Sequence, residues 1–153
     1  MVNAQIYSTT TVKDLLQKKG NVVWTVSPET TLKEALQLMA AKHIGAVLVL
    51  EGGKTVGIFS ERDYARQMAS TRKITMVTPV KDLMTHPIFY VTPSESIEAC
   101  LALMTSKRFR HLPVIDDNCL TGIISVGDIV KQIILERDVT IKDLEDYIWV
   151  HMI

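Results

Sequence analysis

The chain has 153 residues, a length that suits one domain or two small repeats sharing a core. Lys and Arg together number 17, and so do Asp and Glu, so the zero formal net charge gives no general attraction to nucleic acid or an anionic membrane. The sequence contains no secretory signal pattern and no apolar run long enough to cross a bilayer. We therefore expect a soluble, cytoplasmic protein with no membrane partner.

The same strand-to-helix pattern occurs twice, sixty-five residues apart. Residues 57–64 read GIFSERDY and residues 122–129 read GIISVGDI, so the chain is a duplication. In each copy a buried strand is expected to run into a helix start, where the serine and the aspartate can cap the helix. A helix start also attracts anions, and a carboxylate three residues after a hydroxyl can accept hydrogen bonds from a ribose diol. Helix capping alone is the alternative interpretation of both aspartates.

Both copies predict elements in the order β-α-β-β-α, preceded by a short helical turn. In the first copy these are a turn at 12–16, a strand at 22–26, a helix from 32, and a strand at 46–50 with a hairpin loop at 51–54. In the second copy they are a turn at 80–84, a strand at 88–91, a helix from 97, and a strand at 112–115 with a hairpin loop at 116–118. The order predicts a mixed α/β (α+β) fold whose two half-folds pack about a pseudo-two-fold axis and form two related clefts. The predicted division is a first repeat with its lead-in at 1–76, a second repeat at 77–136 and a C-terminal helix or tail at 137–153.

Some features are not shared by the two copies. The first copy carries about three extra residues, around positions 17–20. Residues 140–149 form a pattern typical of a short amphipathic helix, whose Tyr147, Ile148 and Trp149 would need cover, and this favours a homodimer. Cys100 and Cys119 lack CxxC spacing, so we expect buried thiols rather than a disulfide or a metal site.

The ordered set of motifs, present twice, resembles a tandem pair of cystathionine-β-synthase (CBS) domains, also called a Bateman module. The resemblance covers about residues 10–136 and rests on GIFSERD and GIISVGD, HLPVID at 111–116, the Val-Ser-Pro and Val-Thr-Pro strand ends, and DLMT at 82–85. It implies a stand-alone, non-catalytic regulatory module. The ligand would be an adenosine-containing molecule such as AMP, ADP, ATP, NAD(H) or S-adenosylmethionine, bound in the clefts between the copies. Binding would then regulate another protein.

The resemblance also implies roles for individual residues. Asp63 and Asp128 match the aspartate that grips the ribose, with the hydroxyls of Ser60 and Ser125 beside them. In the second copy, the stretch after the central helix is expected to face phosphate oxygens, since arginine binds them with two parallel hydrogen bonds. This stretch comprises Arg108, Phe109, Arg110 and His111. A core histidine bonded to backbone is the alternative interpretation of His111.

The two clefts are expected to differ. In the first copy the matching stretch contains Gly45 and Ala46, which have no such donors but leave space for a flat ring. Arg62 and Arg66 lie about one helical turn apart and are candidates for phosphate contact, with solvated surface charges as the alternative. The base is expected between the lead-in strands, around Gly20, Asn21 and Val22 on one side and Thr85, His86 and Pro87 on the other.

Other classes of function are less well supported. The sequence has no HExxH, nucleophile elbow or glycine-rich phosphate loop, so we expect neither catalysis nor a catalytic cofactor or metal. Two non-catalytic alternatives stay open. One is a structural dimerisation module without a ligand. The other is nucleic-acid binding through Arg108, Arg110 and His111, which the neutral overall charge disfavours.

Overall fold

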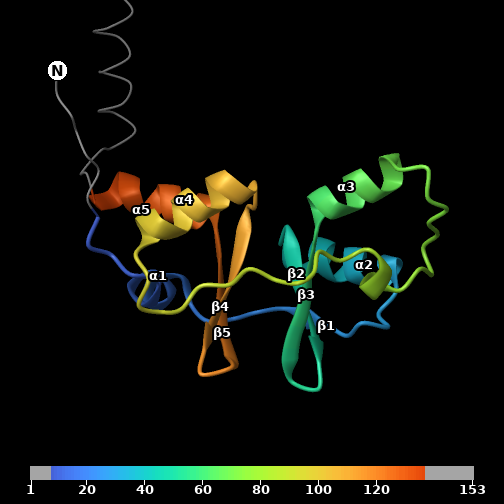
Figure 1. Ribbon diagram of the computed structural model, residues 1–153, viewed down its shortest axis with the longest axis horizontal. Helices are drawn as coiled ribbons and strands as arrows, with labels where there is room; N and C mark the ends of the chain where they lie inside the picture. Colours follow the sequence, from blue (N-terminus) through green and yellow to red (C-terminus); the bar gives the residue numbers. More distant parts are fainter. Residues whose placement is uncertain (1–7, 137–153) are drawn as a thin grey trace, which may run out of the picture. The chain divides into compact units, whose positions relative to one another are not determined.

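The computed structural model describes residues 8–136 (Figure 1). The elements, in chain order, are α1 (Val12–Lys19), β1 (Thr25–Val26), α2 (Leu32–Lys42), β2 (Ala46–Glu51), β3 (Lys54–Ser60), α3 (Glu61–Ala69), the 3-10 helix η1 (Val80–Asp82), α4 (Ile97–Lys107), β4 (His111–Asp116), β5 (Cys119–Ser125) and α5 (Val126–Glu136). A helix, a two-stranded hairpin and a second helix thus follow one another twice. The predicted mixed α/β fold with two repeats is confirmed.

Both hairpins turn through two residues with positive φ. Gly52 and Gly53 join β2 to β3 with φ of 57° and 78°, and Asp117 and Asn118 join β4 to β5 with φ of 45° and 63°. Positive φ at both central residues is the requirement of a type I′ turn, whose twist matches that of the flanking strands. The two predicted hairpin loops are confirmed.

The helices begin where hydroxyl residues can cap them. Thr11 accepts a hydrogen bond from the backbone N–H of Asp14 at the start of α1, and Thr31 does the same for Glu34 at the start of α2. Ser96 caps α4. Each of these side chains satisfies one of the backbone donors left without a partner at a helix start. The predicted helix starts at residues 32 and 97 are therefore confirmed.

The predicted lead-in strands are shorter than expected. Of residues 22–26, only Thr25 and Val26 form a strand, which pairs in parallel with β2, and residues 88–91 form no strand. Val22 is 72% exposed and Tyr90 is 53% exposed. Apolar and aromatic residues fit a strand when a partner strand and a buried face are available, and these side chains have little buried face.

The described residues form two compact units. One contains residues 8–20, 91–112 and 124–136, and is called here the α5 unit. The other contains residues 21–90 and 113–123, and is called the α3 unit. Each unit therefore combines most of one repeat with the lead-in segment of the other.

In the α3 unit, the lead-in of the second repeat completes the core of the first. Val80 and Leu83, at η1, are at most 1% exposed and lie in one buried cluster with Leu32, Ala35, Met39, Val47, Val49 and Phe59. The backbone N–H of Leu32 donates to the carbonyl of Thr78 at 2.8 Å. A β-carbon on Gly57 would lie 2.3 Å from Sδ of Met84, so a larger residue there would force the Met84 side chain to move.

In the α5 unit, the lead-in of the first repeat packs with the second. The backbone N–H of Val12 donates to the carbonyl of Glu95 at 2.8 Å, and both α1 and α4 contact α5 (Figure 1). The sequence order places each lead-in before its own repeat, whereas the structure packs it with the other one. Order along the chain does not determine where a lead-in packs, because the segment of about a dozen residues that joins it to its own repeat is long enough to let it reach the core of either unit.

The two cysteines have different environments. Cys100 on α4 is 1% exposed, and burial raises the pKa of its thiol to about 11. Cys119 is exposed, so the prediction of a buried thiol is wrong for this residue, which directly follows the β4–β5 turn. The predicted helix at 140–149, with Tyr147, Ile148 and Trp149, lies outside the described residues. No helix within 8–136 has the length and apolar character needed to cross a membrane.

Candidate functional site

The first candidate site lies at the start of α3, where β3 ends. The backbone N–H and the hydroxyl of Ser60 both donate to Oδ2 of Asp63 at 2.9 Å, and the backbone N–H of Asp63 donates to Oγ of Ser60 at 3.2 Å. This reciprocal pair is a capping box, which fixes the carboxylate at the first turn of the helix. The predicted capping geometry is present, and it holds the Asp63 side chain in a half-buried position.

The lead-in of the second repeat reaches this carboxylate. Thr85 exchanges two backbone hydrogen bonds with Ile58 on β3, at 2.8 and 3.1 Å. This bridge positions the Thr85 hydroxyl, which donates to Oδ1 of Asp63 at 3.0 Å. The first site thus joins a motif of one repeat to the lead-in of the other through neutral donors.

The other residues predicted for the first site lie around the start of α3. The carbonyl of Gly45 accepts from the backbone N–H of Glu61, the first residue of α3, at 3.0 Å. Ala46, the next residue, is 6% exposed and pairs with Ser60 across the hairpin. Arg62 and Arg66 are both exposed on α3.

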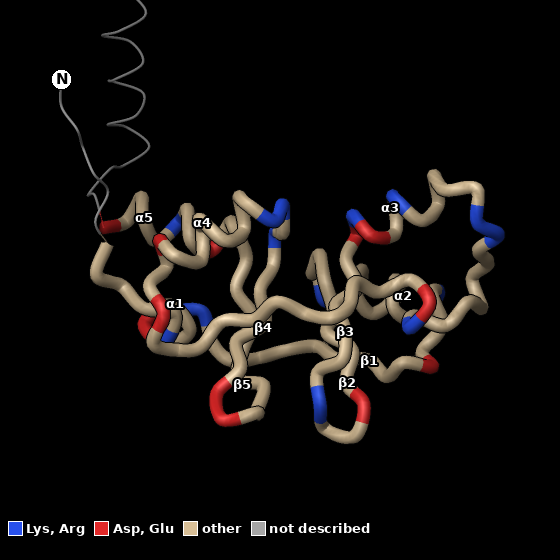
Figure 2. The backbone as a smooth tube through the Cα atoms, viewed as in Figure 1, with Lys and Arg blue, Asp and Glu red and all other residues tan. Residues whose placement is uncertain are grey.

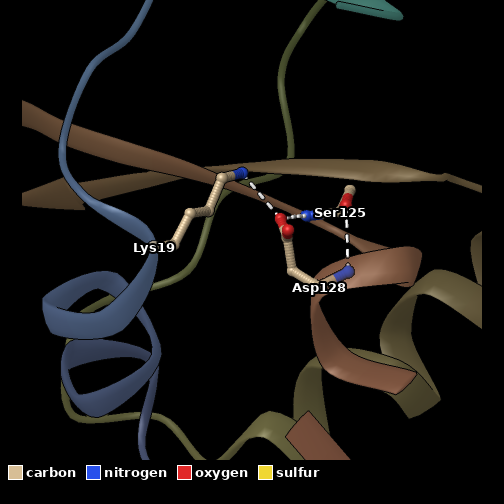
Figure 3. A network of polar contacts seen from close by, with 3 residues as sticks. All are labelled: Lys19, Ser125 and Asp128. Atoms are coloured by element: carbon tan, nitrogen blue, oxygen red, sulfur yellow. Dashed lines mark hydrogen bonds and ion pairs between the residues drawn. The ribbon is translucent and has the colours of Figure 1, made fainter. Parts of the chain in front are cut away.

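The second candidate site repeats this geometry at the start of α5. The backbone N–H of Ser125 donates to Oδ2 of Asp128 at 2.8 Å, and the backbone N–H of Asp128 donates to Oγ of Ser125 at 3.2 Å (Figure 3). The carbonyl of Arg110 accepts from the backbone N–H of Val126 at 2.9 Å, as Gly45 does in the first site. The duplication therefore extends to single hydrogen bonds.

The contact from the lead-in differs between the two sites. Lys19, the last residue of α1, extends its side chain toward Asp128, and its Nζ lies 2.6 Å from Oδ2 (Figure 3). Burial alone would raise the pKa of the Asp128 carboxyl. The hydrogen bonds from Lys19 and Ser125 and the charge of Lys19 outweigh that effect and hold the pKa below its usual value. The second site therefore contains an ion pair where the first has a hydroxyl.

The extra residues of the first lead-in account for this difference. They extend α1 to eight residues, whereas the equivalent η1 has only three. The added turn carries Lys18 and Lys19 onto α5, where Nζ of Lys18 donates to Oε1 of Gln132 at 3.3 Å. Gln132 is 4% exposed while Lys18 is exposed, so α1 and α5 share a partly buried polar contact beside the ion pair.

The residues predicted to bind phosphate follow α4. Arg108 ends this helix with φ of 58°, the same left-handed conformation that His43 has after α2. Arg108 and Arg110 are exposed, while Phe109 and His111 are half-buried. The backbone bond of Arg110 places this stretch directly beside the start of α5.

The segments predicted to contact the base follow the lead-in contacts directly. His86 and Pro87 are exposed and come after Thr85. The residues after Lys19 are also exposed, namely Gly20, Asn21 and Val22. In both sites, therefore, the residue bound to the aspartate is followed by accessible chain.

Two of these contacts differ from what the sequence suggested. Lys19 was not among the predicted site residues, and Thr85 was expected to lie near the base rather than on the carboxylate. The unequal lead-in lengths were the only signal for Lys19, because a longer helix ends at a different place. Among residues 8–136, no group of three or more His, Cys, Asp or Glu is placed to hold a metal ion.

Comparison with known sequences identifies the family. The sequence profile of the CBS domain matches residues 12–70 and 80–135, so the protein belongs to the CBS domain family. It is 31% identical over 152 residues to the CBS domain-containing protein CBSX3, mitochondrial, of Arabidopsis thaliana, covering 93% of this chain and 73% of the relative. It is 35% identical over 118 residues to the CBS domain-containing protein YhcV of Bacillus subtilis, covering 77% of this chain and 81% of the relative.

Solved structures give the same result. The CBS domain structure NE2398 superposes with a TM-score of 0.79 at 44% identity, covering 82% of this chain and 99% of that one. The CBS-domain protein ATU1752 from Agrobacterium tumefaciens superposes with a TM-score of 0.77 at 39% identity, covering 80% of this chain and 98% of that one. The CBS domain pair of protein MJ0100 was solved in complex with 5′-methylthioadenosine and S-adenosyl-L-methionine. It superposes with a TM-score of 0.71 at 23% identity, covering 80% of this chain and 94% of that one, a likeness that shows the shared fold. Pairs of CBS domains are regulatory modules.

Proposed function

We propose that this protein is a cytoplasmic regulatory sensor that binds an adenine nucleotide, AMP, ADP, ATP or NAD(H), through Asp63 and Asp128, and so controls another protein. The observation that carries this proposal is the repeated geometry of the two aspartates. Each carboxylate is fixed at a helix start by its own serine and contacted by the lead-in of the other repeat. A change at either carboxylate therefore affects two segments that are distant in sequence, as a sensor requires.

Both carboxylates retain capacity for a ligand. An ionised carboxylate offers about four acceptor positions. Asp63 accepts three hydrogen bonds from residues within 8–136, two from Ser60 and one from Thr85. Asp128 accepts two, from Ser125 and Lys19. A ribose diol supplies two hydroxyl donors, and such donors bind an ionised acceptor more strongly than a neutral one.

The basic side chains near each motif favour a phosphate on the ligand. Arg62 and Arg66 follow Ser60 on α3, and Arg108, Arg110 and His111 precede β5 and α5 in the second copy. The MJ0100 domain pair, which shares the fold, was solved with two adenosine compounds. Adenosine-containing ligands are therefore the class that we propose for this chain.

Nucleic-acid binding has less support. Every described helix of eight or more residues carries both basic and acidic side chains, and the two signs are interspersed along the backbone (Figure 2). Binding to a phosphate backbone depends on a stretch of positive charge. A site for a single nucleotide needs only a local group of such residues.

Calorimetric titration with AMP and with GMP tests the proposed function. We expect AMP to bind and GMP to bind at least about tenfold more weakly, a difference of roughly 1.4 kcal/mol, because the proposed site is selective for adenine. ATP and NAD(H) are titrated in parallel to identify the preferred adenine ligand. Equal affinity for AMP and GMP, or no heat with any adenine ligand up to millimolar concentration, would contradict the proposal and favour a structural dimerisation module.

A further inference from the structure

We propose that Lys19 makes the Asp128 site selective for phosphate-bearing adenosine ligands over neutral or cationic ones. The inference rests on the proposed function of that site and narrows its ligand class. It starts from the ion pair between Nζ of Lys19 and Oδ2 of Asp128, which are 2.6 Å apart (Figure 3). The two side chains are 32% and 25% exposed, so a ligand can reach both groups.

A neutral nucleoside gains little at such a carboxylate. Its ribose hydroxyls must share Asp128 with Lys19 or displace the ammonium group, and they offer no anion in return. Displacing Lys19 breaks a charge-assisted hydrogen bond, which is about twice as strong as one between neutral groups. A nucleoside that displaces Lys19 therefore loses part of what its hydroxyls gain, and one that shares Asp128 with Lys19 makes no use of the ammonium charge.

A nucleotide changes this balance. Its phosphate gives Lys19 a second anion on the same ligand whose ribose occupies Asp128. The lysine side chain has a flexible four-carbon stem and three donors, so it can turn from the carboxylate toward a neighbouring phosphate without movement of the backbone. A cationic ligand, such as a sulfonium compound, meets like-charge repulsion from the same ammonium group.

The Asp63 site has no charged lead-in residue on its carboxylate that could select for a phosphate-bearing ligand. Its contact is the Thr85 hydroxyl, which is neutral and donates to Oδ1 at 3.0 Å. The difference follows from the extra turn of α1, which ends at Lys19, compared with the three-residue η1. The two sites should therefore favour ligands of different charge, although the backbone hydrogen bonds between the serine and the aspartate are the same in both.

The test compares AMP, adenosine and S-adenosylmethionine by calorimetry, in an Asp63→Ala background so that only the Asp128 site reports. With Lys19 present, we expect AMP to bind at least about tenfold more tightly than the other two ligands. Lys19→Gln should weaken AMP at least about tenfold and leave adenosine unchanged or bound more tightly. Lys19→Arg, which keeps the charge, should retain most of the preference for AMP.

Lys18→Gln is the matched control, because Lys18 is the neighbouring lysine of α1 and contacts Gln132 instead of Asp128. It should leave the ratio of AMP to adenosine affinity unchanged, and circular dichroism verifies that each variant is folded. If AMP binds but this ratio is the same in Lys19→Gln, the inference about Lys19 is wrong while the proposed function stands. If the Asp63→Ala parent binds no adenosine ligand, the proposed function of this site fails, and the inference with it.

Discussion

Each motif aspartate fixes its own helix start and is only half-buried. Asp63 and Asp128 both accept from the backbone N–H of the serine three residues earlier. This bond would be present in a purely structural capping box, such as that of Thr31 and Glu34. The distinguishing feature is the further contact from the other repeat's lead-in, which a cap does not require.

The ion pair of Asp128 predicts a dependence of stability on pH. The folded-state pKa of Asp128 lies below its usual value, so the pair stabilises the fold above about pH 4, the ordinary range of the carboxyl. This contribution is lost as the pH falls through the folded pKa. Asp128→Asn should lower the free energy of unfolding by about 0.5–1 kcal/mol at pH 7, since the pair is partly exposed.

Urea denaturation of the wild type and Asp128→Asn between pH 7 and pH 3 measures this effect. The difference between the two proteins should stay constant from pH 7 to about pH 5 and shrink as the pH falls further toward pH 3. A difference that stays constant over that range would show that the ion pair makes no contribution.

At the level of single residues, the sequence identified the motifs but not all of their contacts. The spacing of Ser60 and Asp63, repeated at Ser125 and Asp128, was sufficient to predict both capping pairs. It could not predict that Thr85 and Lys19 reach the carboxylates, because that contact depends on which core each lead-in joins.

The interface of α1 and α5 is held by one buried polar side chain. Gln132 is the one buried polar residue within 8–136, and it accepts from Lys18 and donates to Oε1 of Glu136 at 3.1 Å. Glu136 also accepts hydrogen bonds from Ser8 and Thr10, which lower the pKa of its carboxyl. Gln132 and Glu136 on α5 thereby contact two parts of the first lead-in, Lys18 on α1 and the segment of Ser8 and Thr10 before it.

Gln132→Ala should therefore destabilise the protein by about 1–3 kcal/mol, because Lys18 and Glu136 lose a partner and the side chain leaves a gap. Thermal or urea unfolding measures the change. Gln67→Ala is the matched control, since Gln67 occupies the equivalent position on α3 and is only half-buried. It should change stability by less than about 0.5 kcal/mol. Equal effects of the two substitutions would contradict the role assigned to Gln132.

At the level of elements, periodicity predicted the helices and hairpins well, and composition predicted the lead-ins poorly. The two-residue turns of Gly52–Gly53 and Asp117–Asn118 are local features that the chain encodes by itself. The predicted lead-in strand at 22–26 needs the edge of a partner strand, and only Thr25 and Val26 pair with one, β2.

For the whole molecule, the homodimer stays a prediction, and exposed apolar side chains on α5 are the surface that we assign to it. Val130, Ile134 and Leu135 are 42%, 39% and 58% exposed, and the first two lie four residues apart on one face. The equivalent residues in the first copy are Ala65 and Ala69 on α3 and Ser70 directly after it, which offer little apolar surface. Exposed groups of large apolar side chains commonly mark protein interfaces.

We predict that light scattering gives twice the chain mass of 17.2 kDa and that Ile134→Lys weakens the dimer. Burying an unpaired ammonium group at an interface is costly, whereas the equivalent Ala69→Lys places its charge on a surface that we expect to stay exposed. A monomer at micromolar concentration would contradict the prediction. A dimer that Ile134→Lys leaves intact would place the interface elsewhere.

The central claim is that the paired aspartates bind an adenosine ligand, and calorimetric titration of AMP into three proteins tests it most directly. These are the wild type, the double variant Asp63→Ala/Asp128→Ala, and the control Glu34→Ala, which removes a capping carboxylate outside the motifs. We predict that the wild type and the control bind AMP with equal affinity. Each aspartate substitution alone should cost its site about 1.5–3 kcal/mol, the value of hydrogen bonds to a charged group, so the folded double variant should bind AMP at least about tenfold more weakly than the wild type. A folded double variant that binds AMP as tightly as the wild type would contradict the claim and leave both aspartates as helix caps.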